Sequence, residues 1–127
     1  MKKILIVDDQ AAWVAFNTSI VKDILGDEIT IHTASSGTEA YNLLLENILQ
    51  PYDYILTDLQ MEEDYSPKAA GEWFVEQAKE MSFYDNTKII IISAAPFITH
   101  IAERLGVNYI RKQDATVSKD FYIENIK

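Results

Sequence analysis

Cysteine, basic side chains and long apolar runs are scarce or missing in this sequence of 127 residues. The absence of cysteine excludes disulfide bonds, thiolate metal sites and a cysteine nucleophile. Only 11 lysine and arginine residues stand against 20 aspartate and glutamate residues, so the net charge is −9 and the basic face of a general nucleic-acid binder is not expected. No apolar run approaches the roughly 20 residues of a membrane span. We therefore predict no direct binding to nucleic acid and no membrane insertion.

The remaining composition is that of an ordinary globular domain, with 48% hydrophobic and 24% charged residues. A chain of this length can bury a sufficient core as one domain without disulfides. Met1, Lys2 and Lys3 look like the start of a signal peptide, but only four apolar residues follow before Asp8. We therefore expect a cytoplasmic protein with a single domain over residues 1–127.

The most informative pattern is an apolar run that leads into acidic residues, and it occurs twice. Residues 4–7 lead into Asp8 and Asp9, and residues 54–57 lead into Asp58. A short continuous apolar run fits a strand that is buried on both faces, as parallel strands are. Parallel strands of an open α/β sheet end on the same side, which is where such folds bind their ligands. The three carboxylates are therefore predicted to converge on one crevice.

Converging carboxylates suggest a bound cation, because like charges a few ångströms apart disfavour one another's ionised form. Mg²⁺ suits this pattern best, since it takes oxygen ligands, accepts one or two carboxylates and keeps waters that a phosphate can replace. Ca²⁺ would require more protein oxygens. Each acid alone could instead be a strand-end residue or a helix N-cap, as for Asp9 before a helical pattern.

Apolar runs and segments of helical period alternate along the whole chain, which predicts an α/β fold with a parallel sheet. We expect five strands and five helices. The predicted strands are residues 4–7, 28–33, 53–58, 88–93 and 107–111. The predicted helices are residues 10–25, a segment from the capping box at 36–39 to Pro51, residues 67–82, residues 97–105 and a short last helix near Phe121, Tyr122 and Ile126.

Two further strands lead into polar residues, Ser93 and Lys112. Acids that hold a metal, an ammonium group and a hydroxyl are the parts that phosphoryl transfer requires. A carboxylate can be the nucleophile and form an aspartyl-phosphate. Asp58 is the candidate, because it follows a strand from the middle of the chain and precedes an adaptable loop. Taken singly, Ser93 could be a simple strand-end residue and Lys112 a solvated charge.

With these motifs in place, the chain resembles the receiver domains of two-component response regulators, as a divergent, stand-alone example. The resemblance covers essentially all 127 residues and rests on VDD ending at Asp9, TDLQM carrying Asp58, ISA carrying Ser93 and YIRK carrying Lys112. It implies a (βα)5 flavodoxin-like three-layer sandwich, with a five-stranded parallel sheet in the order 2-1-3-4-5.

The resemblance also implies a role for each site residue. Asp58 would accept phosphate, and Ser93 and Lys112 would bind the phosphoryl oxygens. Mg²⁺ would be held by Asp9, Asp58 and the backbone carbonyl of Gln60, with Asp8 acting through water. Ser93 would also act as a switch together with Tyr109, an aromatic residue that would swing inward on activation, although Tyr109 alone could be a half-buried strand residue.

The partners implied by the resemblance are a sensor histidine kinase or a phosphotransfer protein and an unknown downstream protein. The domain would catalyse its own phosphorylation and dephosphorylation at Asp58. A homodimer is one oligomeric state that the sequence leaves open. Because residues 1–127 leave no room for an effector domain, we expect the output to pass through another molecule or through relay of the phosphoryl group.

The sequence departs from the family pattern at three places. Gln113 follows the lysine where the family usually has a proline that is often cis, so we expect a trans bond there. Glu62 replaces another usual proline, and Gly71 follows Asp58 at a longer interval than is typical, which predicts an enlarged acidic loop. The segment between Ser93 and Lys112 is short, which predicts a clipped fourth helix.

Three other classes of function are less compatible with this sequence. An aspartate-nucleophile phosphatase of the haloacid-dehalogenase type would carry Asp-x-Asp after the first strand, which Asp8-Asp9-Gln10 does not match. A phosphorylation-independent interaction module is favoured by the altered loops and opposed by the complete residue set. A flavodoxin-like cofactor binder would need a phosphate-cradling loop where the acids lie. His32 and His100 are interpreted as surface residues.

Overall fold

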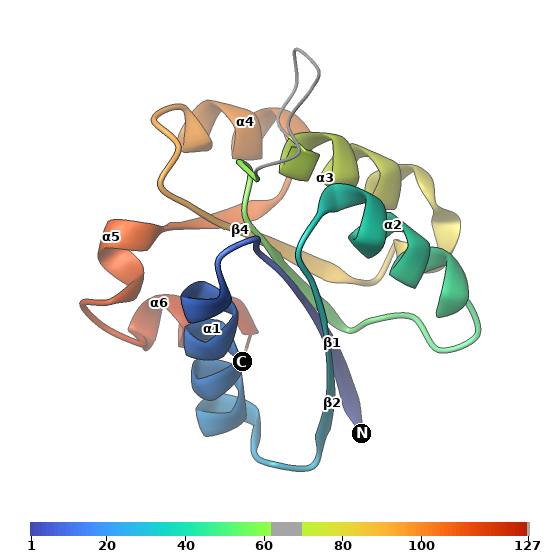
Figure 1. Cartoon of the computed structure of the whole chain (residues 1–127), viewed down its shortest axis with the longest axis horizontal. Helices are drawn as coiled ribbons and strands as arrows, with labels where there is room; N and C mark the ends of the chain where they lie inside the picture. The colour runs from blue at the N-terminus through green and yellow to red at the C-terminus, as the bar shows by residue number, and fades with distance from the viewer. Residues whose placement is uncertain (62–69, 127) are drawn as a thin grey trace.

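The computed structural model describes residues 1–61 and 70–126, and its centre is a five-stranded parallel sheet (Figure 1). The strand order is β2-β1-β3-β4-β5, as the resemblance implied. The strands are β1 (Lys2–Val7), β2 (Ile29–Ala34), β3 (Tyr54–Thr57), β4 (Lys88–Ser93) and β5 (Asn108–Arg111). They lie within a residue or two of the predicted runs. β3 is central, and β4 is an interior strand between β3 and β5.

Alternate residues of each strand enter two separate hydrophobic clusters, one on each face of the sheet. The run of isoleucines in β4 shows this, because Ile89 and Ile91 join one cluster while Ile90 and Ile92 join the other. Successive side chains of a strand point to opposite faces, so a continuous apolar run is buried only when both faces are covered. Each interior strand therefore lies between two layers of helices.

The helices divide between the two faces as in a three-layer sandwich (Figure 1). One cluster contains side chains from α2 (Gly37–Glu46), α3 (Ala70–Glu80) and α4 (Ile98–Leu105). The other contains side chains from α1 (Ala11–Leu25), α5 (Lys112–Ala115) and α6 (Asp120–Ile126). A short 3₁₀ turn, η1 (Ser82–Tyr84), follows α3. In the described part of the chain, no helix is long and apolar enough to cross a membrane.

Local sequence signals account for several helix ends. Ser36 caps α2, its side-chain oxygen accepting a hydrogen bond from the Glu39 backbone N–H at 3.0 Å, as the capping-box pattern predicts. Gly26 ends α1 with a φ of 89°, a conformation that other residues rarely adopt. α4 is as short as predicted and ends at Gly106.

The short last helix predicted near Phe121, Tyr122 and Ile126 corresponds to α6, which begins at Asp120. The sequence did not predict α5, a helix of four residues that begins directly at Lys112, so the described residues contain six α-helices rather than five. The peptide bonds of the described residues are all trans, which confirms the expectation for Lys112–Gln113. The predicted helix start at Pro67 and the acidic loop from Glu62 lie outside the described residues.

The two histidines differ in exposure. His100 is exposed, as predicted for a surface residue. His32, by contrast, is half-buried rather than fully at the surface. Its Nδ1 lies 2.7 Å from the Tyr52 hydroxyl, and its ring packs edge-on against the ring of that tyrosine.

Candidate functional site

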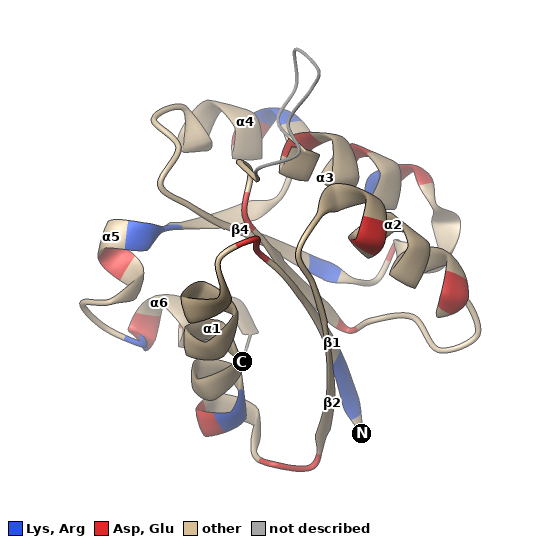
Figure 2. Ribbon diagram, viewed as in Figure 1, with Lys and Arg blue, Asp and Glu red and all other residues tan. Residues whose placement is uncertain are grey.

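The sheet register brings the predicted site residues to one end of the sheet. Val7 of β1 pairs with Thr57 of β3, so Asp8 and Asp58 follow their strands at the same level. Ser93 is the last residue of β4 and pairs with Arg111, the residue before Lys112. Figure 2 shows acidic segments where β1 and β3 end and a basic segment where α5 begins.

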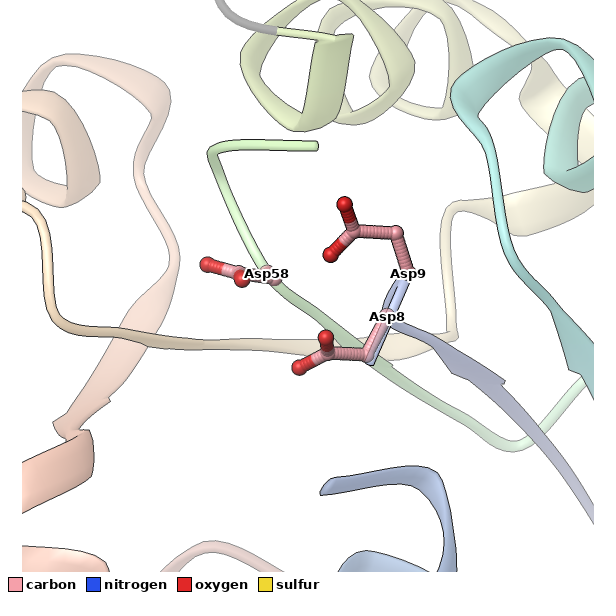
Figure 3. Close-up of side chains that lie close together, drawn as sticks. All are labelled: Asp8, Asp9 and Asp58. Carbon is pink, nitrogen blue, oxygen red and sulfur yellow. The ribbon is translucent and has the colours of Figure 1, made fainter. Parts of the chain in front are cut away.

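The three acids form a compact cluster, as predicted. Asp8, Asp9 and Asp58 each offer a carboxylate oxygen, and these oxygens lie within 4.8 Å of one another. Figure 3 shows the three side chains gathered at the ends of β1 and β3. Asp8 and Asp58 are buried, whereas Asp9 is half-buried and lines the neighbouring cavity. An all-oxygen donor set of this kind fits a hard cation such as Mg²⁺.

Lys112 is a buried residue that joins two of the acids, not a solvated charge. Its Nζ lies 2.9 Å from Asp58 Oδ2 and 3.0 Å from Asp8 Oδ2. Burial, the largest single influence, lowers the pKa of Lys112, but hydrogen bonds and charges from the two carboxylates outweigh it and raise the pKa overall. The ammonium group therefore remains charged at neutral pH. Its fixed position comes from α5, which begins at this residue.

Asp8 is held from two sides. Its Oδ1 accepts a hydrogen bond from the Gln10 backbone N–H at 2.9 Å, and its Oδ2 receives Lys112. Burial raises the pKa of Asp8 above its ordinary value, and the hydrogen bonds from Gln10 and Lys112 act in the opposite direction.

Asp58 lies at the border of an open cavity of about 590 Å³. Its Oδ1 accepts a hydrogen bond from the Leu59 backbone N–H at 2.7 Å, and its Oδ2 accepts one from Lys112. The cavity is also lined by Asp9, Gln10, Trp13, Gln60, Met61, Ser93, Ala94, Lys112, Gln113 and Thr116. A small anion can therefore approach Asp58, Ser93 and Lys112 from one side.

Ser93 and Tyr109 lie in different surroundings. The buried Ser93 hydroxyl accepts a hydrogen bond from the Ala95 backbone N–H at 3.1 Å and also borders the cavity. Tyr109 is half-buried, and its hydroxyl accepts a hydrogen bond from Thr99 Oγ1 of α4 at 3.1 Å. Thr99 in turn accepts one from Arg111 at 2.8 Å. Tyr109 is thus hydrogen-bonded to α4 through Thr99.

Two contacts at the site were not predicted from the sequence, one made by Trp13 and the other by Gly71. Trp13 lines the cavity, and its ring centroid lies 4.8 Å from Lys112 Nζ. Gly71 packs against the chain at Asp58, since its N–H donates to the Leu59 carbonyl at 3.0 Å. The position of Trp13 in the first turn after the acids was the available signal, but no local pattern indicates which distant side chain a helix residue will meet.

No protein-family sequence profile and no curated protein matches the chain. Among solved structures, the chemotaxis response regulator CheY4 of Vibrio cholerae is similar, with 24% identity, a TM-score of 0.67 and coverage of 88% of this chain and 87% of that one. The phosphorylated cyanobacterial phytochrome response regulator RcpA is 22% identical, with a TM-score of 0.69 and coverage of 87% and 80%. The bacteriophytochrome response regulator AtBRR is 16% identical, with a TM-score of 0.77 and coverage of 99% and 90%. The chain therefore has the fold of the response-regulator receiver domains.

Proposed function

We propose that residues 1–127 form a cytoplasmic receiver domain of a two-component system or phosphorelay, in which Asp58 accepts a phosphoryl group. The observation that carries this proposal is the buried contact of Lys112 with Asp58 at 2.9 Å beside an open cavity. A buried lysine between two carboxylates is costly to assemble for stability alone, because both partners lose their hydration. The arrangement is better explained by chemistry at Asp58.

In the proposed step, an Asp58 carboxylate oxygen attacks the phosphorus of a phosphohistidine or a small acyl phosphate. The new O–P bond forms as the bond to the donor breaks, and the leaving nitrogen or carboxylate takes the electron pair. Lys112 and Ser93 bind the phosphoryl oxygens: the positive charge of Lys112 is in place before transfer, and Ser93 donates its hydroxyl once the phosphoryl group has drawn it towards Asp58. Dephosphorylation reverses the roles, with water attacking phosphorus and Asp58 leaving.

Mg²⁺ is the proposed cofactor, held by Asp9, Asp58 and the backbone carbonyl of Gln60, with Asp8 acting through water. When bound, the ion would neutralise charge on the phosphoryl group. Support comes from the convergence of the three carboxylates and from the oxygen-only donor set.

The proposed switch links the phosphoryl group to the surface around α4 and β5. A phosphoryl group adds negative charge and acceptor oxygens, which would draw the Ser93 hydroxyl away from Ala95. Tyr109 would then leave Thr99 and turn inward, which would change the face that a downstream protein reads. The expected donor is a sensor histidine kinase or phosphotransfer protein, and a homodimer is among the assemblies that the altered face could favour.

The central experiment measures a magnesium-dependent adduct on Asp58. The whole chain is incubated with acetyl phosphate, and separately with beryllium fluoride, each with and without Mg²⁺, and its intact mass and NMR spectrum are recorded. We expect an adduct and spectral changes that require Mg²⁺ and are lost in Asp58→Ala but kept in Asp85→Ala, an exposed acid outside the cluster. No adduct and no change in the unaltered chain would contradict the proposal and favour a phosphorylation-independent module.

A second experiment separates the roles of the two neighbouring acids. Asp9→Ala should weaken Mg²⁺ binding more than Asp8→Ala does, because Asp9 is assigned as a direct ligand. Titration of each variant with Mg²⁺ would measure this difference, and equal titration curves would overturn the assignment.

A further inference from the structure

Trp13 lies next to the ammonium group of Lys112, the lysine that contacts both Asp8 and Asp58. Its ring centroid is 4.8 Å from Lys112 Nζ, within the range of a cation–π contact. Trp13 is half-buried and borders the cavity beside Asp58. The ammonium group thus has two carboxylates and one aromatic ring as neighbours.

The ring of Trp13 is itself held in place by other aromatic side chains. It packs edge to face against Phe16, with centroids 5.4 Å apart, and Phe16 packs against Tyr122 of α6 at 6.4 Å. The Tyr122 hydroxyl donates a hydrogen bond to the buried Asn17 Oδ1 at 2.6 Å. These contacts anchor the ring to the packing of α1 against α6, so its orientation is set by the core.

A fixed ring matters because the lysine side chain is long and flexible. A lysine ammonium presents rotatable donors on a four-carbon stem, which costs conformational entropy to immobilise. The carboxylates attract the charge but do not define its place once a phosphoryl group competes for it. A ring of fixed orientation attracts the charge along one direction and leaves the donors free for oxygen atoms.

We propose that Trp13 is a positioning residue that holds the Lys112 ammonium group where it can bind the phosphoryl oxygens at Asp58. This inference rests on the proposed function of Asp58. A residue that merely filled space would not need an aromatic face toward the ammonium group. Leucine and phenylalanine are both smaller than tryptophan, but only phenylalanine preserves a π face.

The test begins from Trp73→Phe, which leaves Trp13 as the sole tryptophan. Trp73 belongs to α3 and packs against Tyr41, outside the cavity lining. In this background the rate of phosphorylation by acetyl phosphate is measured against donor concentration. Trp13→Leu should lower kcat/KM about tenfold, which equals about 1.4 kcal/mol and lies within the range of a desolvated cation–π contact. Trp13→Phe should stay within about threefold of the parent.

Fluorinated tryptophan makes the test independent of shape. Fluorine withdraws electron density from the ring face and weakens its attraction for a cation while barely changing its size. We expect kcat/KM to fall with each added fluorine in the single-tryptophan chain. Equal activity across the fluorinated series, or equal activity of Trp13→Leu and Trp13→Phe, would overturn the inference.

An NMR measurement keeps the two proposals distinguishable. The Lys112 Hε protons should be shifted upfield by the Trp13 ring, with the signal assigned through its loss in Lys112→Arg. The shift should vanish in Trp13→Leu and persist in part in Trp13→Phe. An ordinary Hε position in the parent overturns the positioning role whether or not Asp58 is phosphorylated. An upfield shift without any phosphorylation of the parent contradicts the function of Asp58 and, with it, the positioning role toward the phosphoryl group.

Discussion

Replacing Gly71 with alanine should displace the backbone that carries Asp58. A Cβ built on Gly71 would lie 1.8 Å from the Asp58 carbonyl oxygen and 2.7 Å from Leu59 Cα, and real Cβ atoms essentially never approach within 3.0 Å. The atoms in the way belong to the backbone, so no side-chain rotation can relieve the clash. Either α3 or the chain after β3 must move by more than an ångström.

The expected loss of stability follows from two opposing contributions. Overpacking a dense interior costs about 1–3 kcal/mol, and a clash with backbone belongs at the upper end. Alanine within a helix gains about 1 kcal/mol over glycine. The free energy of unfolding should therefore fall by roughly 2 kcal/mol, which lowers Tm by about 8 °C for a domain of this size.

Urea and thermal unfolding measure this loss, and beryllium fluoride binding reports on the displaced Asp58. Gly37→Ala is the matched control, because the three atoms nearest to its added Cβ would all belong to Ala70, at 3.0 Å or more, and none to the backbone of Asp58. We expect the control to lose less stability and to keep its affinity for beryllium fluoride. A Gly71→Ala chain that is as stable as the parent, or that binds beryllium fluoride no more weakly than the control, would refute the close approach of Gly71 to the backbone of Asp58.

Three further outcomes are expected. Tyr122→Phe should lower the free energy of unfolding by about 1–3 kcal/mol in urea melts, because it leaves the buried Asn17 side chain without its 2.6 Å hydrogen bond; no loss would mean that water replaces the hydroxyl. Burial raises the pKa of Tyr84 to about 12 and also raises that of Tyr122, above the value of about 10 in the unfolded chain. The folded state then binds more protons, so stability is intact below about pH 10 and falls as the pH rises further; urea melts at pH 9 and pH 11 that coincide would contradict this. Thr99→Val should remove the hydrogen bond that holds Tyr109 and tighten beryllium fluoride binding about fivefold, which corresponds to the free energy of one hydrogen bond. Unchanged affinity would show that Thr99 does not restrain Tyr109.

The sequence alone determined the layout of the fold and the membership of the acidic cluster. Buried parallel strands require continuous apolar runs, so the runs before Asp8 and Asp58 marked two adjacent strands and the end of the sheet where their carboxylates meet. Helix starts with strong local chemistry, such as the cap at Ser36, were predicted for the same reason: the signal lies within a few residues.

Contacts between distant segments were decided only by the tertiary structure. The burial of Lys112 between two acids, the ring of Trp13 against its ammonium group and the approach of Gly71 to Asp58 each join residues that are well separated in the chain. Local periodicity reports which face of an element is buried, but it does not report which side chain lies opposite. Which side chains meet depends on how whole helices pack against the sheet. Here that packing places Lys112 between the converging acids.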